Sequence, residues 1–161
     1  MKAAILSDTH ENMEAIDSAC ALIKEEKAEL ILHAGDIISP IALRRFQNAG
    51  ALMIAVYGNN DGERLLLEET IRSFGAITQG FYEGELAGKK VLMMHEPRGL
   101  EALVRSQSYD LIVYGHTHKV DMRKEGKTTV INPGELGGWL HAEKNFVMMD
   151  IPSMEYRLIK L

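Results

Sequence analysis

His116 and His118 stand one residue apart at the end of an apolar run, directly after Gly115. The chain has six histidines in all, so two in one short motif suggest a shared task. Packing explains a single buried imidazole, but it does not easily explain a pair at this spacing. Side chains two positions apart project to the same side of an extended chain, so both rings can reach one bound ligand.

Four other apolar runs also end in residues that bind metals. Asp8 and His10 follow residues 2–7, Asp36 follows 30–34, Asn59, Asn60 and Asp61 follow 52–57, and His95 follows 91–94. In open α/β sheets the carboxyl ends of the strands share one edge, where ligands bind. Glycines at 35, 58 and 115 let the backbone turn sharply at that edge.

The residue types at these strand ends indicate a metal site. Imidazoles and carboxylates together suit divalent Mn, Fe, Co, Ni or Zn. The candidate ligands are Asp8, His10, Asp36, Asn59, His95, His116 and His118. This set is too large for one tetrahedral zinc ion and suits two ions about 3.5–4 Å apart that share a carboxylate. Two aspartates only partly offset two divalent cations, so the site attracts an anion, with phosphate as the leading candidate.

Each motif has a simpler explanation when taken alone. A D-x-H or G-D motif more often forms a turn or a cap than a metal ligand, and an H-x-H motif also occurs as a surface pair. All of these motifs together, each after a strand, are difficult to explain in that way. The combination therefore favours a metal site.

Hydrophobic periodicity predicts the elements that position these residues. Strands at 2–7, 30–34 and 52–57 alternate with helices at 13–26, 40–48 and 63–74, which indicates parallel strands with crossover helices. Hairpins are expected at 81–94, 120–132 and 146–160, with a short helix at 100–106 and a strand at 111–114. The pattern predicts a mixed sheet, or two packed sheets, with helices outside.

Composition narrows the class of protein. The 161 residues, 46% hydrophobic and 25% charged, fit a single domain over residues 1–161. A net charge of −5 argues against duplex nucleic acid as a partner, because binding it needs clustered Lys and Arg. Cys20 is the one cysteine, so a reducing compartment is natural. No signal peptide or spanning segment is evident, so we expect a cytoplasmic protein with no membrane partner.

The combined motifs resemble those of the calcineurin-like metallophosphoesterase superfamily. They are D-T-H at 8–10, G-D at 35–36, G-N-N-D at 58–61, His95 and G-H-T-H at 115–118. The short length and the I-N-P-G segment at 131–134 resemble the small single-domain bacterial and archaeal phosphodiesterases of that superfamily. The resemblance implies an α/β fold, a four-layer αββα sandwich of two mixed β-sheets flanked by helices, with the site at the strand ends.

The resemblance also implies a ligand set and a mechanism. It assigns Asp8, His10, Asp36 and His118 to one metal ion, and Asp36, Asn59, His95 and His116 to the other. Asp36 is then the bridge, and a metal-bridging hydroxide attacks phosphorus in line. Two divalent ions are implied, with Mn²⁺ the leading candidate, although Ni²⁺, Co²⁺, Fe²⁺, Zn²⁺ and Mg²⁺ also suit the ligands.

Two residues of the G-N-N-D motif stand out as supporting catalytic residues. Many relatives have histidine where this chain has Asn60, and that histidine is assigned to protonating the leaving oxygen or contacting phosphate. An amide cannot act as a general acid near neutral pH, so poor leaving groups should suffer most. Small phosphodiesterases of the family often lack this histidine too. Asp61 matches the carboxylate of the family but has no histidine to orient.

Several residues beside the ligand motifs have open roles. Glu11, Glu96 and Glu135 stand where relatives often have glycine or serine. We hypothesise that they make the mouth of the site acidic and so disfavour a dianionic monoester; the alternative is that each is a solvated charge at the rim. Arg98 either contacts phosphate or is simply exposed, and the roles of Trp139 and His141 stay open.

The leading functional hypothesis is a dinuclear-metal phosphodiesterase acting on a small phosphodiester. The alternatives are a phosphomonoesterase and a non-catalytic metal-binding scaffold resembling the small retromer subunit. All seven ligand positions are filled, which favours the enzyme, whereas Asn60 is a step toward the scaffold. The substrate, the native metal and the formation of a homo-oligomer stay open.

Overall fold

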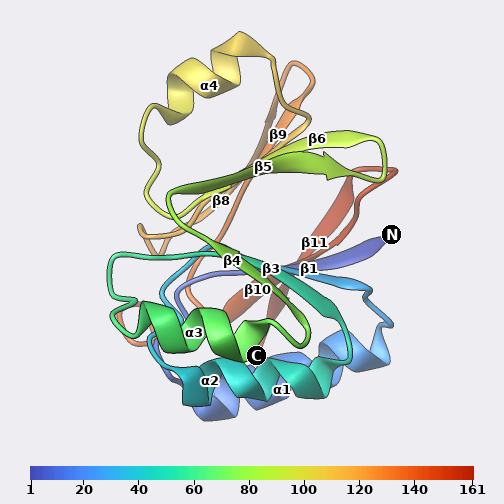
Figure 1. Cartoon of the computed structure of the whole chain (residues 1–161). Coiled ribbons are helices and arrows are strands. Elements are labelled where there is room, and N and C mark those ends of the chain that lie inside the picture. Colours follow the sequence, from blue (N-terminus) through green and yellow to red (C-terminus); the bar gives the residue numbers. More distant parts are fainter.

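Two β-sheets pack face to face, and helices cover the outer face of each (Figure 1). The computed structural model describes all residues, 1–161. The helices are α1 (Met13–Glu25), α2 (Pro40–Arg45), the 3-10 helix η1 (Phe46–Ala49), α3 (Arg64–Ile71) and α4 (Leu100–Ser106). Helices α1 to α3 lie on one side of the molecule and α4 lies on the other, which confirms the expected four-layer αββα sandwich.

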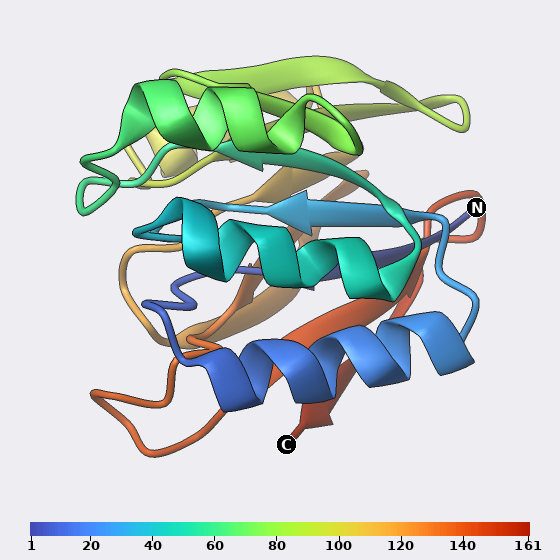
Figure 2. The ribbon, with the colours of Figure 1, turned by 60° about the horizontal axis from the view of Figure 1, so that its bottom comes forward.

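The first sheet has six strands in the order β11-β10-β1-β2-β3-β4. Its strands are β1 (Lys2–Leu6), β2 (Leu30–His33), β3 (Leu52–Val56), β4 (Gly75–Thr78), β10 (Asn145–Asp150) and β11 (Glu155–Lys160). The four strands β1 to β4 run parallel, and the hairpin β10–β11 joins them through an antiparallel pairing with β1. Figure 2 shows α1, α2 and α3 side by side in front of this sheet.

The second sheet has five strands in the order β5-β6-β7-β9-β8. Its strands are β5 (Phe81–Leu86), β6 (Lys89–Met94), β7 (Leu111–Val113), β8 (Val120–Glu125) and β9 (Thr128–Pro133). β6, β7 and β9 run parallel, while β5 and β8 pair antiparallel at the two edges. The carboxyl ends of β6 and β7 therefore emerge together.

The continuous apolar runs of the central strands follow from burial on both faces. In β1, Ala3 and Ile5 belong to the core between the sheets, whereas Ala4 and Leu6 belong to the core beneath the helices. A smaller third core lies between α4 and the second sheet. None of the helices has the length and apolar character needed to cross a lipid bilayer.

Local signals explain where the helices begin. The Asn12 side chain accepts a hydrogen bond from the Ala15 amide at 3.1 Å and caps α1, as expected. Ser39 caps α2, and Pro40 occupies its first turn. Both caps stand where a strand-end loop passes into a helix, so they fix the direction in which the chain leaves the site.

The structure differs from the sequence expectation after α3. This helix was expected to extend to residue 74, but it ends at Ile71, and β4 follows at Gly75. Gly75 lies against the Met53 carbonyl so closely that a Cβ atom would collide with it. A four-residue strand with partly exposed side chains has no clear periodicity, so its pairing with β3 was not visible in the sequence.

Candidate metal centre

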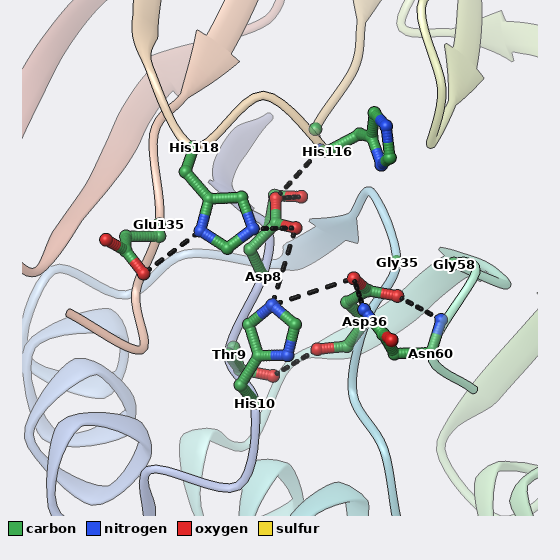
Figure 3. Close-up of polar contacts among 12 residues, drawn as sticks. Asp8, Thr9, His10, Gly35, Asp36, Gly58, Asn60, His116, His118 and Glu135 are labelled. Atoms are coloured by element: carbon green, nitrogen blue, oxygen red, sulfur yellow. Dashed lines mark hydrogen bonds and ion pairs between the residues drawn. The ribbon is translucent and has the colours of Figure 1, made fainter. Parts of the chain in front are cut away.

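The strand ends of both sheets meet in one cluster of polar side chains (Figure 3). Asp8, His10, Asp36 and Asn59 follow β1, β2 and β3 of the first sheet, and His95, His116 and His118 follow β6 and β7 of the second. Contacts of 2.8–3.7 Å link all seven of these residues. The structure thus brings together the complete candidate ligand set, and both sheets contribute to it.

Asp8, His10 and His118 form the first half of this cluster. The Oδ2 atom of Asp8 accepts hydrogen bonds from the Ser7 hydroxyl at 2.5 Å and from the His116 amide at 3.0 Å. Its Oδ1 atom lies 3.3 Å from Nε2 of His118 and 3.7 Å from Nε2 of His10. Asp8 Oδ1 and His10 Nε2 are both buried without a hydrogen-bond partner.

These unpartnered atoms fit a metal ion. A buried polar atom without a partner is costly, and native structures rarely keep one. A carboxylate oxygen and two imidazole nitrogens that face one another are also a common ligand set for a divalent metal. The ligand atoms of Asp8, His10 and His118 lie within 4.8 Å of one another, as do those of Asp8, Asp36 and His95. A cation between these ligand atoms would give the buried, unpartnered atoms Asp8 Oδ1 and His10 Nε2 a partner.

Glu135 fixes the orientation of His118. Its Oε2 atom lies 3.1 Å from Nδ1 of His118 and, as a carboxylate oxygen, it accepts the Nδ1 proton. That tautomer leaves Nε2 of His118 free toward Asp8. Burial raises the pKa of Glu135, but hydrogen bonds from the His141 amide and from His118 outweigh it and hold the pKa below its usual range. The carboxylate therefore stays charged beside the centre.

Asp36, Asn59, His95 and His116 form the second half of the cluster. The Nδ1 atom of His95 donates to the Ala34 carbonyl at 2.7 Å, so Nε2 faces Oδ1 of Asn59 at 2.8 Å and Oδ2 of Asp36 at 3.4 Å. Nδ1 of His116 lies 2.9 Å from the same Asn59 oxygen. Because Nε2 of His95 faces two acceptor oxygens, it must carry a proton or a metal ion.

Asp36 lies between the two halves. Its Oδ2 atom is 3.6 Å from Nε2 of His10 and 3.4 Å from Nε2 of His95. Burial raises the pKa of Asp36, but the contact with His95 and the hydrogen bonds from Asn60 outweigh it and lower the pKa well below its usual value. An ionised carboxylate that reaches histidines from both halves suits the role of a shared ligand.

The structure gives Asn60 a task that sequence reasoning did not find. Its backbone amide donates to Oδ1 of Asp36 and its side-chain amide donates to Oδ2, both at 2.8 Å. These two bonds fix both oxygens of the Asp36 carboxylate. Asn60 is therefore a positioning residue for Asp36: the donor to Oδ1 belongs to the backbone, and the donor to Oδ2 belongs to the asparagine side chain.

Asp61 is buried, with 2% of its surface exposed. Its two oxygens accept hydrogen bonds from the amides of Asp36, Ile37, Ile38 and Gly58 at 2.7–3.0 Å. One carboxylate thus joins the loop after β2 to the loop after β3. The supporting role expected for Asp61 is to hold the backbone of these loops, because its side chain is fully used by backbone donors.

The backbone at the site is unusual. Asp8, His10, Asp36, His116 and His118 all have left-handed φ angles, between 41° and 65°. Residues other than glycine rarely adopt this conformation, and its cost is typically offset by surrounding contacts at functional sites. Left-handed turns at these five positions bend the chain back on itself and direct the side chains inward.

The structure contradicts one part of the hypothesis of an acidic rim, the exposed position of Glu135. Glu135 is not part of an acidic mouth, because it is 1% exposed and bonded to His118 and to three backbone amides. Glu96 forms a 2.8 Å ion pair with Arg98, which offsets its charge. Only Glu11 remains an exposed carboxylate without a partner of this kind. Sequence reasoning did not reveal that Glu135 turns inward, because its nearby partners are the backbone amides of residues 139–141, which any residue type except proline supplies.

The three residues whose roles were open lie around the same centre. Trp139 donates from Nε1 to the His10 carbonyl at 3.1 Å, so the loop between β9 and β10 lies against the first half of the site. His141 contributes its backbone amide to Glu135 at 2.6 Å. The Arg98 side chain is 83% exposed and pairs with Glu96.

Comparisons with known proteins agree with this geometry. Residues 1–154 match the calcineurin-like phosphoesterase superfamily domain. The chain is 36% identical over 165 residues to the phosphodiesterase MJ0936 of Methanocaldococcus jannaschii, covering 100% of this chain and 99% of that protein. A solved structure of an archaeal phosphodiesterase superposes with a TM-score of 0.94 at 36% identity, covering 100% of both chains.

The chain belongs to the calcineurin-like phosphoesterase superfamily, as its motifs indicated. Vacuolar protein sorting 29 of Cryptosporidium parvum shares the fold alone, with a TM-score of 0.74 at 17% identity over 99% of this chain and 96% of that one. The fold is therefore common to proteins of different names, and the side chains at the strand ends must decide the chemistry.

Replacing Glu135 by glutamine should weaken metal binding. The Glu135→Gln variant keeps the size of the side chain but removes the charge that orients His118, and losses of about 10- to 100-fold in metal affinity are typical of such changes. Titration calorimetry with Mn²⁺ measures the effect. The matched control is Glu143→Gln, because Glu143 lies on the same loop but pairs with exposed Lys160. Equal affinities in both variants would contradict the role of Glu135.

The Asp61→Asn variant should be destabilised by about 2–4 kcal/mol. The carboxylate of Asp61 accepts hydrogen bonds from four buried backbone amides, whereas the NH₂ group of asparagine would face some of these N–H donors with donors of its own. Urea unfolding of the metal-free protein measures the loss. Glu68→Gln is the control, because it removes a carboxylate from an exposed i,i+4 pair with Arg72. That change should cost at most about 0.5 kcal/mol. A comparable loss in the two variants would mean that Asp61 does not hold the loops.

Proposed function

We propose that this protein is a metal-dependent phosphodiesterase that binds two divalent ions and hydrolyses a small phosphodiester. Asp8, His10 and His118 hold one ion, Asn59, His95 and His116 hold the other, and Asp36 is shared. When bound, the two ions supply Lewis acidity and a hydroxide for in-line attack on phosphorus. The observation that carries the proposal is the buried, unpartnered pair of Asp8 Oδ1 and His10 Nε2.

The relatives support the same reaction class. The Methanocaldococcus jannaschii protein, which covers the whole chain at 36% identity, is a phosphodiesterase by name. So is a protein of Escherichia coli, at 26% identity over 84% of this chain. With all seven ligand positions filled and converging, the enzyme is favoured over a scaffold that no longer needs them.

The charge of the centre favours a diester over a monoester. Asp8, Asp36 and Glu135 place three carboxylates in the cluster, against four positive charges on two divalent ions. The hydroxide that the ions supply adds a fourth negative charge, so the centre is close to neutral before the substrate binds. A phosphodiester then adds one uncompensated negative charge, whereas a monoester dianion adds two. Neither Arg98 nor any other cation is held against the cluster to offset a second charge.

We propose Mn²⁺ as the leading candidate for the native metal, because it accepts the two carboxylates and the amide oxygen as well as the four imidazoles; Ni²⁺, Co²⁺, Fe²⁺, Zn²⁺ and Mg²⁺ are the alternatives. A cytoplasmic location is proposed from the single unpaired cysteine, Cys20, which is buried in α1. We also propose that residues 1–161 form one domain. The proposed substrate is a small molecule and not duplex nucleic acid.

Hydrolysis of bis-p-nitrophenyl phosphate beside p-nitrophenyl phosphate tests this function. Apo protein supplied with Mn²⁺ should cleave the diester faster than the monoester. His116→Ala should reduce kcat/KM for the diester at least ~100-fold, because it removes one of the proposed metal ligands. His141→Ala is the control, because only the backbone of His141 contacts the site.

The outcomes separate the alternatives. A preference for the monoester would establish a phosphomonoesterase. Silence toward every diester, in folded protein shown to hold two ions with each metal tested, would overturn the enzyme and leave the scaffold. If His116→Ala left the activity unchanged, the proposed metal centre would not be the site of hydrolysis.

The absence of an acid at Asn60 predicts a steep dependence on the leaving group. General acid catalysis typically contributes about 10²- to 10⁴-fold, so diphenyl phosphate should be cleaved at least ~100-fold more slowly than bis-p-nitrophenyl phosphate, whose phenolate leaves unaided. The Asn60→His variant should narrow this ratio. Its rate on the nitrophenyl ester is the internal control for the position of Asp36. Similar rates for both esters in the native protein would reveal another acid.

A further inference from the structure

A cavity of about 540 Å³ opens beside the second half of the metal centre. Asn59 and His95 belong to its wall as well as to the ligand cluster, so the cavity and the centre are continuous. From there it extends between α4 and the strands β5 and β6. Its volume lies within the range of about 300–1,000 Å³ that is usual for pockets binding small molecules.

The floor of the cavity is apolar. Phe81 pairs with Met94, and Glu83 pairs with Leu92, across the antiparallel ladder of β5 and β6. Directly opposed residues share a face of the sheet, and here it is the face that α4 covers. Phe81 and Met94 therefore form one apolar surface with Leu103 of α4. Phe81 is 58% exposed, which leaves its ring open to a bound group.

Aromatic rings form the walls. Tyr57 and Tyr109 both line the cavity, and Tyr109 packs with Leu103 against the core beneath α4. The guanidinium of Arg64 lies 5.2 Å from the centre of the Tyr57 ring and holds that ring in place. Three aromatic side chains, Phe81, Tyr57 and Tyr109, thus line the cavity, a composition that suits a flat ring through offset or edge-to-face packing.

The charged groups of the lining cancel. Arg98 pairs with Glu96 at 2.8 Å, and Glu83 accepts a hydrogen bond from the Tyr109 hydroxyl at 3.1 Å. Arg64 donates to the Asp61 carbonyl at 3.1 Å. Two arginines and two glutamates leave no net charge in the lining. The cavity therefore suits an uncharged group, and it does not favour a second phosphate or a charged chain.

We propose that this cavity, the ring pocket, binds a flat aromatic substituent of the phosphodiester substrate, an aryl group or a nucleobase, while the metal centre holds the phosphate. The assignment rests on the proposed function for the position of the phosphate. It adds the chemical class of the substituent, which neither the ligand set nor the relatives define. Polar atoms at the rim, such as the Gln79 amide, are available to the edge of a nucleobase.

Binding of paired probes to protein loaded with Mn²⁺ tests the ring pocket without turnover. Phenylphosphonate and methylphosphonate both present a phosphonate to the metal centre, but only the first carries a ring. AMP and ribose 5-phosphate form a second pair, which differs by the nucleobase. We expect the aromatic member of at least one pair to bind about tenfold more tightly, as measured by calorimetry. The pair that shows the preference identifies the aryl or the nucleobase as the source of the ring.

Two variants assign the preference to the pocket. Phe81→Ala removes an exposed ring from an edge strand, so the fold should persist and the preference should shrink at least threefold. Ile41→Ala is the matched control, because Ile41 is 64% exposed on α2 and lies outside the pocket. Circular dichroism confirms folding of both variants. The control should keep the full preference of the native protein.

The outcomes distinguish this inference from the proposed function. Equal affinity within both pairs, or a preference that Phe81→Ala leaves intact, would overturn the ring pocket even if diesters are hydrolysed. A ring preference lost in Phe81→Ala would support the pocket even if no diester is cleaved. In that case the reaction would have to be reconsidered, and the binding site would stand.

Discussion

Asp36 lies where the two sheets meet, and its carboxylate faces histidines that come from both of them. Much of the local structure follows from keeping that carboxylate ionised and fixed. Asn60 holds both of its oxygens, and Asp61 holds the backbone on which it stands. Gly58 must lack a side chain, because a Cβ atom there would collide with Oδ1 of Asp36. A buried charge of this kind is tolerated only when nearly all of its neighbours are arranged around it.

Hydrogen bonds to groups outside the cluster orient the histidine ligands. Nδ1 of His95 donates a hydrogen bond to a backbone carbonyl, and Nδ1 of His118 donates one to Glu135. Each histidine therefore presents its Nε2 atom to the centre. Orientation by a second hydrogen bond is usual for histidines that bind metals. Glu135 extends this order to the loop between β9 and β10 through three amides. The centre and that loop are therefore parts of one hydrogen-bonded unit.

The sequence was sufficient to predict the ligand cluster but not what surrounds it. Strand-end positions follow from periodicity and from the shared edge of parallel strands, so Asp8 and Asp36, which follow strands of one sheet, could be placed together without a structure. His95 follows β6 of the second sheet and joins them only through the packing of the two sheets. The motif singled out Asp61 but not its task, because its partners are backbone amides, which carry no sequence signal. The bond between Glu135 and His118 likewise depends on how two loops meet. The ring pocket depends on how α4 lies over β5 and β6. β4 was missed because four residues are too few for a pattern.

The place of β1 has a consequence for how the chain folds. β1 carries the first residues of the centre and lies between β2, which follows within thirty residues, and β10, which begins at Asn145. During synthesis, the edge of β1 that faces β2 can pair early, whereas the edge that faces β10 stays open until residues 145–150 have emerged. An apolar strand with an open edge invites pairing with other chains. The order of assembly thus makes the hairpin β10–β11 a late protection of the nascent protein against aggregation.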